Sequence, residues 1–161
     1  MIQHKYRRTS YWWPLIKSLV AFLNVQKSED EVDEDGNPLP LFDGVAIYAG
    51  SRGKGKDFPC IEIGYESEGD VSVPVPNVGQ AVLTIDVCVE GSDEDPSEAY
   101  RLQDELQGKI LSRLPDWPRI ARDEAGIAPN VTIDGIASDG DIYRPVAYSR
   151  IFLNVEWRKP L

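Results

Sequence analysis

Apolar residues occupy every second position along several short stretches of the chain, a pattern that predicts half-buried β-strands. The period of two runs through LTIDVCVE (83–90), CIEIGY (60–65) and YSRIFLNVEWR (148–158). Successive side chains of a strand point to opposite faces of the sheet, so each strand should present one apolar and one polar face. GVAIYA (44–49) and NVTIDGIAS (130–138) are predicted as further strands.

Helical spacing of apolar residues appears in two segments. Residues 11–24, YWWPLIKSLVAFLN, predict the first helix, with a proline in its first turn, where a missing N–H has no cost. The second helix is expected after an acidic turn. Asp95 is placed as its N-cap, Pro96 at its first position and Glu98 at its third, and Pro115 should end it.

The remaining segments predict connections. Residues 28–38, SEDEVDEDGNP, contain acids without a basic residue and are expected to form a solvated acidic loop. In residues 66–80, valines alternate with polar residues, and two prolines exclude a central strand. This segment is either an extended arm or edge hairpin that grips a neighbour, or a loop without that role. Residues 116–130, DWPRIARDEAGIAPN, are predicted to be irregular.

The order helix, strands, helix, strands predicts one α+β domain over residues 1–161. Because each strand has a single apolar face, the sheet should be covered on one side only. The expected fold is therefore a mostly antiparallel β-sheet with two helices packed on one face, plus the extended arm or hairpin.

The formal net charge of -10 argues against a protein that holds nucleic acid through its phosphates. An acidic surface is nevertheless compatible with DNA that slides past without binding. The longest apolar run, Leu15 to Leu23, is too short for a membrane span, which needs roughly 20 residues. The N-terminus lacks the pattern of a signal peptide, so Cys60 and Cys88 are expected to be free thiols in a reducing compartment.

Residues 50–57, GSRGKGKD, match a phosphate-binding loop up to the last position. Asp57 stands there in place of the Ser or Thr hydroxyl that would hold magnesium. Pro59 and a strand follow, where the phosphate loop would open a helix. Nucleotide binding is therefore not expected.

Zinc binding and nucleophilic catalysis both need residue types that are scarce in this chain. The chain has one histidine, His4, and two cysteines, which do not supply four Cys and His ligands for zinc or a base beside a nucleophile. A calcium-binding loop that starts at Glu31 would need a bidentate Glu at its twelfth position, but that residue is Phe42. We predict no catalytic residue, no metal site and no cofactor.

One carboxylate pair stays open as a catalytic candidate. Glu62 and Asp86 lie on the polar faces of two predicted strands and could be close enough for acid–base chemistry. The interpretation we prefer is a pair of solvent-facing acids on a half-exposed sheet. The acids before the second helix also need no catalytic role, because capping and the helix dipole favour acids at a helix N-terminus.

Four stretches give the chain a resemblance to the tail terminator proteins of long-tailed bacteriophages. They are YWWPLIKSLVAFLN, PCIEIGYESEG, VLTIDVCVEGSDEDPSEAYRLQDELQGKIL and SDGDIYRPVAYSRIFLNVEWR, and together they span most of the chain. Proteins of this family are small α/β proteins that form a hexameric ring on the tail tube. The resemblance implies a non-enzymatic virion protein, assembled in the host cytoplasm, with no membrane partner.

The implied partners are other copies of the chain, the tail tube protein and the head–tail connector, with DNA passing through the ring unbound. The subunit interface is predicted to use Trp12, Trp13, Val71, Val73, Val75 and Val78. The acids predicted to line the channel are Glu66, Glu68, Asp70, Asp93, Glu94 and Asp95. Core packing is the competing interpretation for the two tryptophans.

Three other functions remain open. A neck or tail-completion protein would share the size and charge. A small hydrolase or nucleotide-binding enzyme would use Asp86, Glu62 or the loop at Lys54 and Lys56. A binding module whose acidic surface mimics nucleic acid would bind a DNA-handling protein.

Overall fold

The computed structural model describes residues 12–50, 57–68, 78–91, 97–138 and 146–158. Along the chain its elements are α1 (Trp12–Asn24), β1 (Lys27–Val32), β2 (Pro38–Pro40), β3 (Ala46–Ala49), β4 (Cys60–Glu68), β5 (Val78–Glu90), α2 (Ser97–Arg113), a 3-10 turn (Leu114–Asp116), α3 (Trp117–Ala125), β6 (Ala128–Ser138) and β7 (Val146–Arg158). None of these helices is long and apolar enough to cross a lipid bilayer.

Five strands form the main sheet, in the order β3-β4-β5-β7-β6. β3 runs parallel to β4, and every other neighbouring pair is antiparallel. The alternation read from the sequence sets the pairing, because Ile63, Ile85 and Ile151 lie in register on adjacent strands and are fully buried. The predicted class, α+β with a mostly antiparallel sheet, is confirmed.

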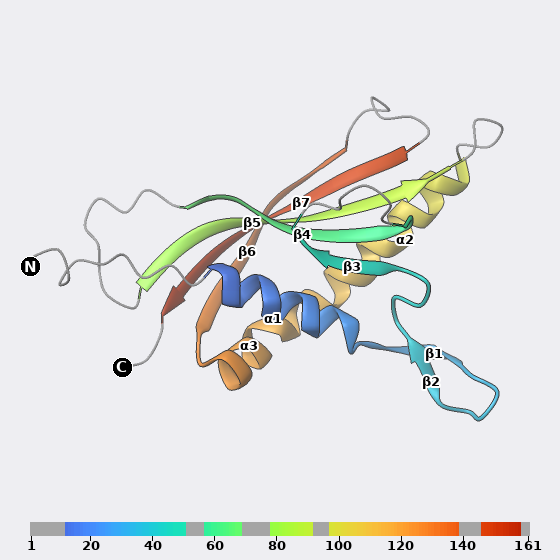
Figure 1. The fold of residues 1–161 in the computed structure, drawn as a ribbon, viewed down its shortest axis with the longest axis horizontal. Coiled ribbons are helices and arrows are strands. Elements are labelled where there is room, and N and C mark those ends of the chain that lie inside the picture. Colours follow the sequence, from blue (N-terminus) through green and yellow to red (C-terminus); the bar gives the residue numbers. More distant parts are fainter. Residues whose placement is uncertain (1–11, 51–56, 69–77, 92–96, 139–145, 159–161) are drawn as a thin grey trace, which may run out of the picture.

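The helices cover one face of this sheet (Figure 1). α1 packs on β3, β4 and β5, α2 on β5 and β7, and α3 on β6 and on α1. Their apolar residues and those of the sheet form one continuous core. Inside it, the buried indole N–H of Trp117 donates a hydrogen bond to Ser18 Oγ at 3.1 Å, which ties α3 to α1.

α3 corrects the prediction that residues 116–130 are irregular. Pro115 does end α2, but the chain passes through the 3-10 turn and starts a new helix at once. Prolines fit the first turn of a helix, and Gly126 closes α3 with a left-handed φ of 68°. Trp117 and Ala121 are four residues apart and both buried, so tertiary packing holds this short helix.

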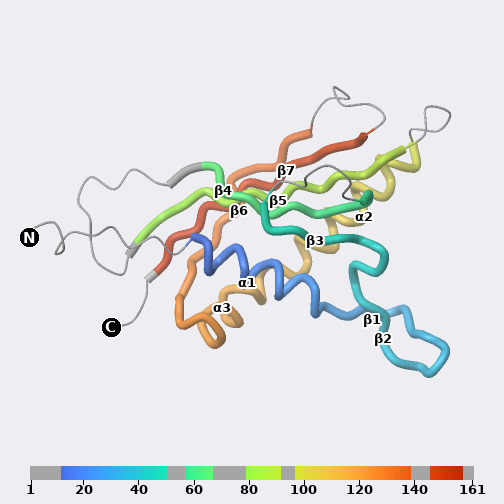
Figure 2. Tube along the Cα trace, in the orientation of Figure 1, coloured from blue at the N-terminus to red at the C-terminus, as the bar shows by residue number. Residues whose placement is uncertain are grey.

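Residues 28–38 also differ from expectation, because most of the predicted loop belongs to a β-hairpin formed by β1 and β2. The hairpin extends away from the main sheet (Figure 2). Its turn is built by Asp33, whose Oδ1 accepts hydrogen bonds from the backbone N–H groups of Asp35 and Asn37, both at 2.9 Å. The acids are solvent-exposed as expected, but the backbone that carries them is ordered by pairing.

Candidate functional site on the sheet face opposite the helices

The sheet face that points away from the helices carries a row of buried and half-buried polar side chains. Glu62 lies opposite Asp86, and Asp86 lies opposite Arg150, so β4, β5 and β7 place the three side chains side by side. Glu62 and Asp86 are only 8% and 6% exposed. The prediction that these two acids are neighbours is confirmed, whereas the preferred interpretation that they face solvent is wrong.

Arg150 forms a two-point ion pair with Asp86. Its Nε donates to Oδ1 at 2.7 Å and its Nη2 to Oδ2 at 3.0 Å, a geometry that fits a planar guanidinium to a carboxylate. Nη2 also donates to the hydroxyl of Tyr148 at 2.7 Å. The hydrogen bond to Asp86 raises the pKa of Arg150, so its positive charge is permanent at this position.

Tyr148 completes this end of the row. Burial raises the pKa of its phenol, and the hydrogen bond to the Asp86 carboxylate raises it further. The positive charge of Arg150 acts in the opposite direction and is the smaller effect. The phenol is therefore held in its neutral form next to the ion pair.

Two thiols lie beside the acids. Cys60 is directly opposite Cys88 on β4 and β5, and both are buried thiols that form no disulfide. The Cys60 thiol contacts Glu62 Oε1 at 3.9 Å. Burial raises the pKa of the Cys88 thiol well above its usual range, and the neighbouring Cys60, Glu62 and Asp86 add to that shift.

This arrangement bears on the acid–base hypothesis. A catalytic carboxylate must reach the proton that it transfers, at a heavy-atom distance of about 2.6–3.2 Å. Asp86 instead has both oxygens bound by Arg150 and is almost completely buried. The geometry is that of an ion pair that joins β5 to β7.

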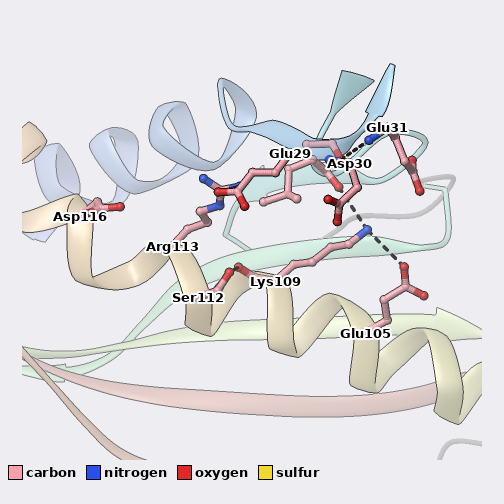
Figure 3. A pocket seen from close by; sticks show the side chains of 10 residues that line it. Glu29, Asp30, Glu31, Glu105, Lys109, Ser112, Arg113 and Asp116 are labelled. Atoms are coloured by element: carbon pink, nitrogen blue, oxygen red, sulfur yellow. Dashed lines mark hydrogen bonds and ion pairs between the residues drawn. The ribbon is translucent and has the colours of Figure 1, made fainter. Parts of the chain in front are cut away.

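A second polar feature is an open groove of about 450 Å³ between the hairpin and α2 (Figure 3). Lys109 and Arg113 extend from α2 toward the hairpin. Lys109 donates to the backbone oxygen of Leu41 at 3.4 Å, and Arg113 donates to that of Lys27 at 3.1 Å. These bonds join both ends of the hairpin to α2, so the groove is explained as the seam that anchors the hairpin.

The structure places some of the predicted interface residues. Trp12 is half-buried and stacks on Tyr65, with ring centroids 4.5 Å apart and planes at 16°. Trp13 is 50% exposed and meets Trp12 edge to face. The core-packing interpretation thus fits Trp12 in part, and Trp13 keeps an exposed ring. Val78 starts β5, opposite Arg158.

Of the six acids predicted to line the channel, two belong to the residues that the structure describes. Glu66 is exposed on β4, and Glu68 lies at the end of that strand. The other predicted residues lie outside the described residues: Asp70, Val71, Val73, Val75, Asp93, Glu94 and Asp95. The same holds for His4, Lys54 and Lys56, and for the cap residues Asp95 and Pro96 of the second helix.

Sequence reasoning missed one surface, the apolar edge at β6. Ile133 and Ile136 are 47% and 45% exposed, although their partners on β7, Leu153 and Ile151, are fully buried. Residues that face each other in an antiparallel pair share one side of the sheet. The isoleucines therefore continue the core face of the sheet to an edge where they stay exposed. A bulge between Ile133 and Gly135 hid the pattern, because it breaks the period of two.

Comparison with protein-family models and with curated protein sequences finds no match to this chain.

Proposed function

We propose that this chain is a structural virion protein of a long-tailed bacteriophage that forms a hexameric ring on the end of the tail tube and joins the tube to the head connector. The sequence resemblance described above suggests this role. The observation that carries it furthest is the exposed apolar edge at β6.

Ile133 and Ile136 belong to the core side of the sheet but remain about half exposed. An apolar strip of this kind on an edge strand favours contact with another polypeptide. A neighbouring subunit that covers the strip would complete the layer that α1, α2 and α3 provide over the same face of the sheet.

The second edge of the sheet differs from the first. β3 has four residues and pairs with β4 only from Cys60 to Ile63. Among the described residues, the part of β4 from Gly64 onward has a partner on its β5 side alone. Two unlike edges on opposite sides of one subunit suit a head-to-tail interface, which closes into a ring when the rotation per subunit divides a full turn.

The hairpin provides a second possible contact between subunits or with the tube. It is anchored at its base by Lys109 and Arg113, extends from the body and carries most of its acids at exposed positions (Figures 1 and 3). An arm with this charge would bind a basic surface. The net charge of -10 also fits a channel through which DNA passes without binding.

A small enzyme is the alternative from another class. The polar row on the sheet contains carboxylates, thiols and a phenol, but the carboxylates and thiols are buried, and Arg150 bonds both Asp86 and Tyr148. Acid–base work by Asp86 would require Arg150 to release it. The row therefore favours a structural role over a catalytic one.

The test combines light scattering and negative-stain microscopy of the purified chain, alone and with purified tail tubes. Wild type should form rings with a central hole, in solution or on tube ends. The variant Ile133→Asp/Ile136→Asp should stay monomeric and leave tubes uncapped at an unchanged melting temperature. Thr132→Asp is the matched control, since Thr132 is exposed on the same strand but pairs with Asn154 on the opposite face.

Two results would contradict the proposal. A wild-type monomer that leaves purified tube ends bare would exclude tube capping. Rings that form equally well with both isoleucines replaced would remove β6 from the interface. Binding to a connector without binding to the tube would favour the neck or tail-completion alternative.

A further inference from the structure

Two sulfur atoms and a carboxylate converge on the sheet face opposite the helices. The ligand atoms of Cys60, Glu62 and Cys88 all lie within 4.8 Å of one another. The three side chains are 0%, 8% and 3% exposed, respectively. They therefore form a compact, mostly buried group of potential ligands that the proposed ring function does not use.

Strand geometry explains why they meet. Cys60 and Cys88 are directly opposite in the antiparallel pair of β4 and β5, so their side chains leave the sheet on the same face. Glu62 follows Cys60 by two residues and shares that face, and its Oε1 lies 3.9 Å from the Cys60 sulfur. The ligand atoms thus come from paired strands of the sheet.

We propose that Cys60, Cys88 and Glu62 bind a zinc ion. Zinc binds thiolate and carboxylate ligands in a tetrahedral arrangement, at about 2.3 Å from sulfur and 2.0–2.2 Å from oxygen. Tetrahedral ligands at these distances are about 3.5–3.8 Å apart, so side-chain movements of roughly 1 Å would bring the three atoms into place.

The donor set selects the metal. Magnesium and calcium require oxygen ligands, and two sulfurs beside one carboxylate suit zinc. On binding, each thiol loses its proton to solvent, so the site holds two thiolates and one carboxylate around the divalent ion. Asp86 is opposite Glu62, but Arg150 binds both of its oxygens. The fourth position would therefore be left to a water molecule.

Zinc is not predicted from the sequence, because its two cysteines and one histidine supply too few ligands. Pairing of β4 with β5 adds Glu62 to the two cysteines, and three protein ligands plus water make a complete coordination shell. The rival chemistry for two opposed cysteines is a disulfide, which would consume both thiolates and exclude zinc.

The experiment uses the reduced, untagged full chain. Zinc binding is measured by competition with a chromogenic chelator, and cobalt replaces zinc as a spectroscopic probe of thiolate coordination. Wild type should take up one zinc ion per chain, show a thiolate-to-cobalt charge-transfer band and melt at a higher temperature with zinc than with EDTA.

Cys60→Ser and Cys88→Ser should each lose the charge-transfer band of a two-thiolate site and the zinc-dependent rise in melting temperature. Glu62→Gln should weaken zinc binding but keep a thiolate band. His4→Ala, which removes the one histidine of the chain, is the control and should bind zinc as wild type does. Circular dichroism in EDTA identifies any variant that fails to fold, and the cobalt spectrum of folded Glu62→Gln then tests the two sulfurs independently.

Absence of stoichiometric zinc binding by the folded, reduced wild type would overturn the proposal. So would zinc binding that persists in both cysteine variants, or loss of binding in His4→Ala alone. Under non-reducing conditions, an intact mass lower by two hydrogens would indicate a disulfide between the two cysteines. If a reductant returns the mass to the value of the free thiols, the pair forms a disulfide and not a zinc site.

Discussion

Arg150 holds Asp86 through two hydrogen bonds of 2.7 and 3.0 Å that connect β7 to β5 across the polar face of the sheet. Asp86 is 6% exposed, so the ion pair is shielded from solvent on the Asp86 side. Removing one member of a buried ion pair leaves an uncompensated charge, which costs more than removing both.

Arg150→Met should therefore lower the free energy of unfolding by about 2 kcal/mol, below the range for fully buried pairs because the Arg150 side chain is 36% exposed. Asp86→Leu/Arg150→Met should recover most of that loss. Urea denaturation measures both. Arg101→Met is the control, because Arg101 pairs with Glu98 and Glu105 on the exposed side of α2, and its urea midpoint should not change. A double variant less stable than Arg150→Met would contradict the account.

Ser18 is the hydrogen-bond acceptor for the buried indole of Trp117. Ser18→Ala leaves that N–H without its partner inside the core, which should cost about 1–3 kcal/mol of unfolding free energy. Ser112→Ala is the matched control: Ser112 is exposed and its hydroxyl bonds within α2, to the Lys109 carbonyl. Thermal or urea denaturation reports both, and equal effects of the two substitutions would show that the indole finds another acceptor.

Two glycines should respond to alanine in opposite directions. A Cβ on Gly79 would overlap ring atoms of Trp157, which is buried against it, so Gly79→Ala should cost about 1–3 kcal/mol. A Cβ on Gly108 would meet nothing within 4 Å, and Gly108 lies inside α2. Gly108→Ala should add about 0.5–1 kcal/mol through helix propensity. The melting temperatures of the two variants should lie on opposite sides of wild type, and a shift of both to the same side would refute the packing argument.

The sequence predicted the elements whose packing imposes a strict period. β4, β5 and β7 alternate cleanly because one face meets the helices, and α1 has apolar spacing throughout. α3 was missed because Pro115 and Pro118 look like helix breakers, although Pro115 fits the 3-10 turn and Pro118 fits the first turn of α3. Its stability comes from the burial of Trp117, which sequence alone does not reveal.

The hairpin was missed for a different reason. β1 is exposed at almost every position, so it has no apolar face and no period to detect. What orders it is the Asp33 turn and the bonds from Lys109 and Arg113, which are far away in sequence.

The candidate site was predictable in part. The polar faces of the strands placed Glu62 near Asp86, but only the strand register brings Arg150 and Tyr148 to the same row. Burial of that face was not predictable from alternation, since a polar strand face is normally solvated. The zinc proposal depends on the same register, because it places Cys60 opposite Cys88.

Tyr148 provides a prediction about alkaline pH. Burial and the Asp86 carboxylate raise its pKa in the folded protein, whereas an unfolded chain ionises tyrosine near pH 10. Above about pH 10 the folded state therefore retains a proton that the unfolded state has lost. Folded chains then bind more protons than unfolded ones, so stability falls as the pH rises through this window.

Urea midpoints measured from pH 8 to pH 11 should thus fall more steeply for wild type than for Tyr148→Phe, which lacks the phenol. EDTA is included throughout so that metal binding at the neighbouring cysteines does not contribute. The Cys88 thiol, whose pKa burial also raises, is present in both proteins and cancels in the comparison. In a spectrophotometric titration of the folded protein, wild type should show one tyrosine that ionises only on unfolding, and Tyr148→Phe should lack it. If the urea midpoints of both proteins fall equally with pH and the two titrations are identical, the phenol of Tyr148 ionises freely. Its contact with the Asp86–Arg150 pair would then not hold its proton.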